Sequence, residues 1–185
     1  TAVPAAVGGD ISIASFNVLN YFATLGQTES GCSFYPDRDG KPTTSRNCTV
    51  RGAYDQDSFL QQQEKIVAAI NSLDASVVAL EEIEASSEVG HSDRDFALAS
   101  LVSALNAAGT AKWDYVSSPS ALPSSEDVIR TAYIYQPDEV SPVGDSVIFQ
   151  HSAFSNARLP LAQEWRAIDP ATNAWGGQSF VTVVN

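Results

Sequence analysis

The amino-acid sequence predicts an α/β protein built of layers, with mixed β-sheets. Three observations support this fold class. Residues 75–80 form a short, valine-rich apolar segment, which is typical of a strand buried on both faces. Two segments of the chain carry apolar residues at helical spacing and are predicted to be helices. A run of strand-like segments follows the second predicted helix. The resulting order of strand, helix, strand, helix and further strands fits a layered protein better than a Rossmann domain.

The elements are predicted in order along the chain. Residues 1–9 are expected to be a linker or lead-in, so that the domain covers residues 10–185, and residues 10–16 alternate as a first strand. A first helix is expected to open at Ser58, with Asp57 or Ser58 as its cap, and the buried strand at 76–80 follows. The second helix is expected to begin near Ser92 or Asp93 and to end before Gly109. The remaining predicted strands cover residues 113–116, 130–135, 143–149, 164–168 and 179–184.

A long polar segment separates the first strand from the first helix. Residues 23–54 are rich in turn formers, and we expect a loop of this length to be functional or pinned by a crosslink. The segment holds both cysteines, Cys32 and Cys48, which are spaced to form a disulfide that stabilises the fold by about 3 kcal/mol. Two thiols without a nearby histidine do not favour zinc. A disulfide points to an oxidising compartment, so we expect a secreted protein, with the periplasm or cell surface as alternatives.

Composition restricts the classes of function. A net charge of −12 over 185 residues repels polyanions at long range, which argues against a passive nucleic-acid-binding module. The charge does not argue against a metal-dependent enzyme, because a bound cation inverts the local field. No segment approaches the roughly 18 apolar residues of a membrane span, so we expect none.

Carboxylates gather where the buried strand ends. Glu81, Glu82 and Glu84 directly follow the apolar residues, at the rim of the predicted sheet. Clustered oxygens there favour a hard cation such as Mg²⁺ or Ca²⁺, although solvated rim charges are the competing interpretation. Asn17 lies at the exit of the first strand. If the two strands are neighbours, Asn17 and Glu82 share one cleft at the carboxyl ends of the strands.

Five blocks of the sequence together carry a resemblance to a known family. The blocks are 13–22 (IASFNVLNYF), Arg51-Gly52-Ala53 with Phe59, Gln62, Lys65 and Ile66, 78–84 (VALEEIE), 127–135 (DVIRTAYIY) and 158–161 (RLPL). They occur in family order across nearly all of the chain, which thereby resembles the endonuclease/exonuclease/phosphatase superfamily and, more narrowly, bacterial extracellular deoxyribonucleases.

The resemblance implies a fold, a reaction and roles for particular residues. The fold is the DNase I-like four-layer sandwich, two mixed sheets with outer helices, of which this chain would supply about the first half. The reaction is metal-dependent hydrolysis of a phosphodiester, most simply of DNA, with Mg²⁺ as the cofactor and Ca²⁺ or Mn²⁺ as alternatives. Glu82 would be the metal ligand and Asn17 the residue that orients the phosphate or a metal-bound water. Arg130 lies near a substrate-binding position, with a surface ion pair to Asp127 as the equal alternative.

The resemblance also implies residues that this chain lacks. In the family, the catalytic histidine follows a strand like residues 180–185, and the chain ends at Asn185. The two histidines, His91 and His151, are expected to be surface residues. We therefore expect the parent protein to carry the missing carboxyl-terminal half, and this chain alone to be inactive.

Two alternatives to a nuclease remain open at this point. One is a phosphatase or a sphingomyelinase-like phosphohydrolase of the same fold. The other is a non-catalytic binding domain.

Overall fold

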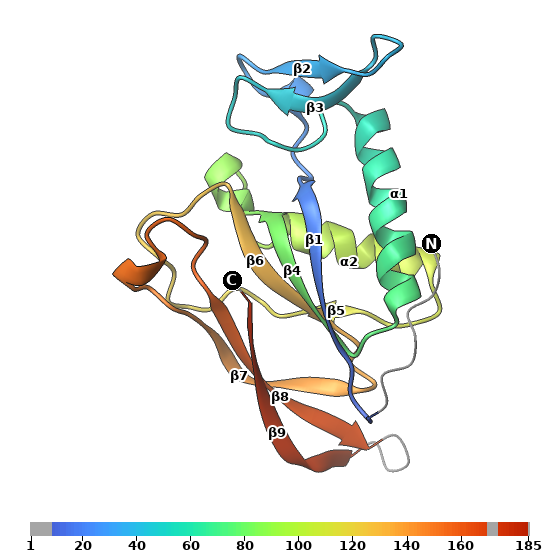
Figure 1. Cartoon of the computed structure of the whole chain (residues 1–185), viewed down its shortest axis with the longest axis vertical. Helices are drawn as coiled ribbons and strands as arrows, with labels where there is room; N and C mark the ends of the chain where they lie inside the picture. Colours follow the sequence, from blue (N-terminus) through green and yellow to red (C-terminus); the bar gives the residue numbers. More distant parts are fainter. Residues whose placement is uncertain (1–8, 170–173, 185) are drawn as a thin grey trace.

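Figure 1 shows the computed structural model of the chain, which describes residues 9–169 and 174–184. A four-stranded sheet with the order β1-β4-β6-β5 forms its centre. β1 and β4 run parallel, whereas β4, β6 and β5 pair antiparallel, so the sheet is mixed as predicted. The strands are β1 (Ile13–Tyr21), β4 (Val77–Glu84), β5 (Asp114–Tyr115) and β6 (Ile129–Tyr135).

The central strand β4 is covered on both faces, as its apolar sequence predicts. Val78 and Leu80 pack into a cluster with the helices α1 (Gln56–Leu73) and α2 (Phe96–Ala108). Val77 and Ala79, which point the opposite way, pack against residues of a second sheet. Both helices lie on one side of the four-stranded sheet in Figure 1. Because successive side chains of β4 point to opposite faces of the sheet, this strand packs against the helices on one face and against the second sheet on the other.

The second sheet has three antiparallel strands in the order β7-β8-β9. They are β7 (Val140–Ile148), β8 (Leu161–Asp169) and β9 (Ala174–Val184). Trp165 of β8 is fully buried between the sheets, with its ring edge-on to Tyr133 and Tyr135 of β6. The described residues thus form three layers, helices, sheet and sheet. This chain therefore contributes strands to two packed sheets.

The helix boundaries differ from the predicted ones for reasons of capping. Asp55, rather than Asp57 or Ser58, caps α1, because its side chain accepts a hydrogen bond from the Ser58 amide at 2.9 Å. The helix ends at Leu73, before a left-handed residue, Asp74, with φ 47°. The second helix begins at Phe96, later than predicted, and Gly109 follows its end.

The predicted long loop contains a β-hairpin that the sequence analysis missed. It consists of β2 (Ser33–Pro36) and β3 (Pro42–Arg46), preceded by the short 3-10 helix η1 (Gly26–Thr28). The hairpin lies beyond the carboxyl end of β1 and beside the start of α1 (Figure 1). Two further 3-10 turns are η2 (Ser86–Val89) and η3 (Ser152–Phe154).

A disulfide closes the base of this hairpin, which confirms the predicted pairing. Cys32 and Cys48 flank the two strands, and their Cα atoms are 4.9 Å apart. Both half-buried cysteines pack against a small apolar cluster that includes Phe22 and Val50. The tip of the hairpin is a polar turn: Asp37 accepts hydrogen bonds from the amides of residues 39 and 41, both at 2.8 Å.

None of the helices in the described residues combines the length and hydropathy that a membrane span requires. Of the predicted linker 1–9, residues 1–8 lie outside the described residues.

Candidate active site

The carboxyl ends of β1 and β4 bring the two predicted site residues onto neighbouring strands. The strands pair in parallel, with Asn17 opposite Glu81, so Glu82 is one position further along. Beyond this point both strands leave regular geometry. On β4, Glu81 and Glu82 together stand opposite the single residue Thr131 of β6, which makes a β-bulge. Glu82 has a φ of 62°, a backbone conformation that glutamate rarely adopts.

The bulge separates the environments of the three glutamates. Glu81 accepts a hydrogen bond of 2.6 Å from the Ser15 hydroxyl on β1. Glu84 is fully buried and accepts the Thr24 amide at 3.0 Å. By contrast, the half-buried Glu82 carboxylate has no hydrogen-bond or ion-pair partner among the described residues. A partly desolvated carboxylate without a partner is costly, and a cation is the group that would compensate it.

Glu84 is the most deeply buried of the three carboxylates. One of its oxygens, Oε1, has no partner among the described residues, and the nearby Tyr21 feels its charge. Burial raises the pKa of the Tyr21 hydroxyl, and the negative charge of Glu84 adds to this effect. Tyr21 in turn accepts a hydrogen bond from Gln63 of α1 at 2.6 Å. Glu84 therefore holds the exits of β1 and β4 together beneath the surface.

Asn17 is exposed at the end of the regular part of β1. Its Oδ1 accepts the Leu19 amide at 2.7 Å, which leaves the side-chain N–H groups without a partner among the described residues. Leu19 and Asn20 both have a φ of 53°, and the Gln62 side chain of α1 donates to the Leu19 carbonyl at 2.8 Å. Consecutive left-handed residues are strained, and such strain concentrates at functional sites. Asn17 also lines a pocket of about 800 Å³, whose lining does not include Glu82.

Arg130 does not have the surroundings that the sequence suggested. Its side chain is 3% exposed and lies 2.6 Å from Asp95, so the alternative of a surface ion pair with Asp127 is wrong. Burial lowers the pKa of the Arg130 guanidinium to about 10, and the neighbouring Arg94 adds to this effect. The group therefore remains charged at neutral pH. In this arrangement the guanidinium is not accessible to a substrate phosphate.

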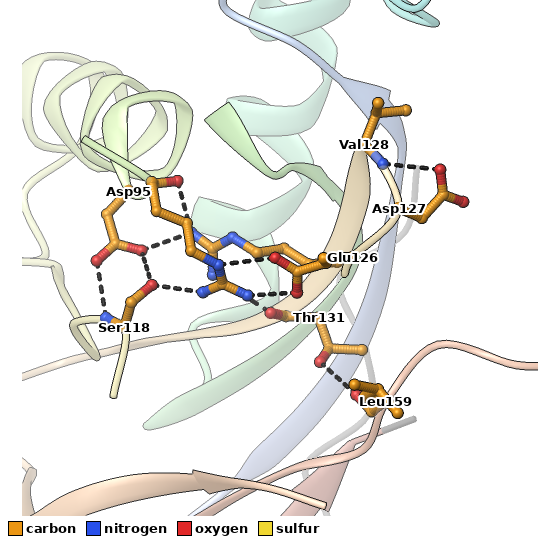
Figure 2. A network of polar contacts seen from close by, with 9 residues as sticks. Asp95, Ser118, Glu126, Asp127, Val128, Thr131 and Leu159 are labelled. Atoms are coloured by element: carbon orange, nitrogen blue, oxygen red, sulfur yellow. Dashed lines mark hydrogen bonds and ion pairs between the residues drawn. The ribbon is translucent and has the colours of Figure 1, made fainter. Parts of the chain in front are cut away.

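Asp95 is the centre of a buried polar network that ties three segments together (Figure 2). It accepts hydrogen bonds from the Ser118 amide at 2.7 Å and the Ser118 hydroxyl at 2.6 Å, besides Arg130. Arg94 forms a two-pronged ion pair with Glu126, at 2.8 and 2.5 Å. The network thus joins the start of α2, the 117–126 loop and β6, next to the bulge that carries Glu82. We infer a structural role for it.

A second arginine cluster lies at the surface and was missed by the sequence analysis. Asp127 receives a bidentate contact from Arg51 at 3.1 and 2.8 Å, and Arg158 approaches it to 2.5 Å. The three residues come from three of the blocks that carry the family resemblance. The spacing of these residues along the chain does not predict that they contact one another. The only indication in the sequence is that the blocks to which they belong occur in family order.

Neither histidine contacts the candidate site residues in the described part of the chain. His91 shares a 3.0 Å hydrogen bond with the Thr24 hydroxyl and stacks on Phe96, so it is half-buried rather than a free surface residue. His151 is exposed and accepts the Ala153 amide at 3.1 Å, as a turn residue. No group of three His, Cys, Asp or Glu side chains is arranged around a possible metal position within residues 9–169 and 174–184. Glu82 alone fits an ion such as Mg²⁺, which keeps most of its waters and takes one or two carboxylates.

No family model matches the sequence, and no curated protein is significantly similar to it. Among solved structures, the chain is similar to ANGEL2, a 2′,3′-cyclic phosphatase, in complex with adenosine-2′,3′-vanadate, at 15% identity and a TM-score of 0.47. That match covers 94% of this chain and 40% of ANGEL2; a second ANGEL2 structure matches at 15% identity and a TM-score of 0.39, over 85% and 37%. A functionally unknown conserved protein from Enterococcus faecalis V583 matches at 18% identity and a TM-score of 0.40, over 70% and 46%. The chain therefore spans less than half of each of these proteins, and likenesses of this strength carry no argument about its activity.

Proposed function

We propose that the protein containing this chain is a secreted, divalent-metal-dependent phosphodiesterase that cleaves DNA. The observation that carries the proposal is the state of Glu82. Of the three carboxylates at the end of β4, it is the one left without a partner among the described residues, and a bulge with a left-handed backbone turns it out of the regular strand. The family resemblance independently selects the same residue as the metal ligand.

The two site residues have complementary tasks in this proposal. Glu82 supplies the anionic oxygen that would hold Mg²⁺ together with water and substrate oxygens. When bound, the cation polarises the phosphoryl oxygen and stabilises charge on the leaving oxygen. Asn17 has its carbonyl oxygen fixed by the Leu19 amide, so its side-chain N–H groups are oriented and free to donate to a phosphate oxygen. The buried Glu84 and its partner Thr24 hold the strand ends in register without touching substrate.

The compartment and the substrate follow from separate observations. A disulfide in the hairpin supports an oxidising, extracellular location. DNA as the substrate is supported by the resemblance to extracellular deoxyribonucleases and by the cationic residues of the pocket next to Asn17.

The test compares two adjacent glutamates in the full-length protein that contains this chain. Supercoiled plasmid is incubated with Mg²⁺, with and without a chelator, using the wild type, Glu82→Gln and Glu81→Gln. Loss of the cation's contribution is worth several kcal/mol, so Glu82→Gln should lower the cleavage rate by about 10²- to 10⁴-fold. Glu81→Gln is the matched control, because it removes the same charge one residue away but from a side chain already bonded to Ser15.

Four results would contradict the proposal. Cleavage that is insensitive to the chelator would exclude metal dependence. Equal losses in the two variants would show a general charge effect instead of a ligand. Absence of any cleavage by the wild type would favour a non-catalytic domain, and faster turnover of a chromogenic phosphomonoester than of plasmid would favour a phosphatase.

A further inference from the structure

The pocket beside Asn17 is built from residues that the proposed reaction does not by itself require. Its walls come from the exit of β1, the tip of the β2–β3 hairpin, residues 51–53 and the first turns of α1. At about 800 Å³ it falls in the range of ligand pockets, which is about 300–1,000 Å³. One block of the family resemblance converges on it, since Arg51, Gln62 and Lys65 all line it.

The pocket holds two of the chain's three lysines, Lys41 and Lys65, although the net charge of the chain is −12. Its lining has as many carboxylates as cationic groups, and the third cation, Arg51, is paired with Asp127 at 3.1 and 2.8 Å. Both lysines are exposed, and neither pairs with a carboxylate of the described residues. Their charges are therefore available to a ligand, and a concave wall focuses their field.

The carboxylates that also line the pocket are largely committed to the backbone. Asp37 accepts two amides of the hairpin turn, and Asp55 caps α1. Only Asp57 has no such bond among the described residues. Hydrogen bonds from backbone amides hold the carboxylates of Asp37 and Asp55 in place, so these two side chains do not turn towards the lysines. The chemistry offered to a ligand is thus that of ammonium and amide donors, which suits phosphate oxygens.

The pocket is continuous with the candidate active site through Asn17, which belongs to both. A ligand that places one phosphate between Asn17 and Glu82 and others near Lys41 and Lys65 must carry several phosphates along a chain. A phosphomonoester or a phospholipid head group has one phosphate region and would leave the lysines unused. A nucleic-acid strand has a phosphate at every nucleotide.

We propose that this pocket binds, through Lys41 and Lys65, the phosphodiester backbone of a nucleic-acid strand next to the phosphate that is cleaved. This inference rests on the proposed function and names its substrate class, a polymeric strand. The strained turn at Leu19 and Asn20, held by Gln62, forms part of the pocket wall. The protein would thereby select a polymer over a single phosphoester.

The experiment measures binding without catalysis. A fluorescein-labelled single-stranded DNA oligonucleotide is titrated with the full-length protein in chelator, and its anisotropy is followed at several salt concentrations. The variants are Lys41→Gln, Lys65→Gln and, as the matched control, Lys112→Gln, which removes the same charge from the third lysine, outside the pocket. Lys112 is exposed and lies 4.0 Å from Asp138.

Each pocket variant should weaken binding, and each should reduce the slope of log K against log salt concentration by about 0.7, the value for one phosphate contact on a single strand. The control should leave the slope unchanged. Unfolding temperatures should stay at the wild-type value, since both pocket lysines are exposed and unpaired within the described residues.

Several outcomes would overturn the inference. One is a wild type that does not bind the oligonucleotide, and another is a slope that falls equally in all three variants or in none. A third is a mononucleotide that competes as well as an unlabelled oligonucleotide at the same phosphate concentration, since the pocket would then bind single phosphates. The plasmid-cleavage assay of Glu82→Gln and the binding titration of the lysine variants are separate readouts, so a failure of hydrolysis chemistry and a failure of pocket binding give different results.

Discussion

The buried pair of Asp95 and Arg130 decides between a structural and a substrate-binding role for the arginine. Arg130 is 3% and Asp95 10% exposed, and their ion pair measures 2.6 Å. We expect Asp95→Asn to destabilise the protein, because it leaves a buried guanidinium next to a second cation, Arg94. Breaking a buried pair by removing one partner costs about 3–5 kcal/mol. The lower end applies here, since asparagine still accepts a hydrogen bond from Ser118 and the charge of Glu126 remains nearby.

The assay is urea unfolding of the wild type, both single variants and the double variant at neutral pH. With a slope of about 2 kcal/mol per molar urea, a loss of about 3 kcal/mol lowers the midpoint by about 1.5 M. Arg130→Met should cost a similar amount, because it leaves the Asp95 carboxylate buried with only Ser118. The double variant should cost clearly less than the sum of the two, which shows that the residues act as a pair.

Two results would refute this reasoning. Costs below about 1 kcal/mol for both single variants would mean that the pair contributes little more than a surface ion pair. A variant Arg130→Met with wild-type stability but weakened DNA binding would restore Arg130 as a substrate contact. The urea midpoint and the anisotropy titration together therefore decide whether Arg130 has a structural or a substrate-binding role.

Three further predictions concern stability. Reduction of the Cys32–Cys48 disulfide should lower the free energy of unfolding by about 3 kcal/mol, given its separation of 16 residues; an unchanged melting temperature in reducing agent would contradict this. Trp165→Ala should cost about 3–5 kcal/mol, because the fully buried ring joins the two sheets, and Trp165→Phe should cost less; calorimetry of both variants checks the order. Burial and the neighbouring carboxylate of Asp114 raise the pKa of Tyr135 from 10.0 to about 12. The folded state then holds this proton more tightly, so its contribution to stability is complete below pH 10.0 and is lost as the pH rises through about 12. As the pH rises between these two values, the free energy of unfolding of Tyr135→Phe should fall less than that of the wild type, as measured by urea titration at each pH. Equal decreases in the two proteins would contradict the prediction.

The parts of the fold that could be predicted are those with a strong local pattern. The apolar residues of β4 and the apolar stripe of α1 indicate burial directly, and both elements lie where they were expected. The β2–β3 hairpin was missed because its strands, SFYP and PTTSR, have no apolar alternation. The turn at Asp37 and the disulfide hold the two strands together.

The candidate site divides in the same way. Glu82 and Asn17 could be proposed from their positions at strand ends, and the structure pairs β1 with β4, which was the condition for a shared cleft. The bulge that distinguishes Glu82 from Glu81 has no sequence signal, because a bulge is a property of two strands in register. The partner of Arg130 was equally hidden, since Asp95 is 35 residues away and belongs to a helix start. Charge pairing over such a separation is decided by the packing of the elements.

The parallel pairing of β1 with β4 has a consequence for how the chain folds. The two strands meet across a long sequence separation, as shown by the hydrogen bond from the Ser12 amide to the Ser76 hydroxyl, 64 residues apart. Non-local contacts of this kind slow folding, because the entropy of closing the intervening chain is lost before the contacts form. The hairpin lies inside that chain segment, and its disulfide shortens the part that remains free to move. Oxidation before folding is therefore expected to accelerate the docking of β1 on β4, so that the compartment in which the protein matures affects its folding rate as well as its final stability.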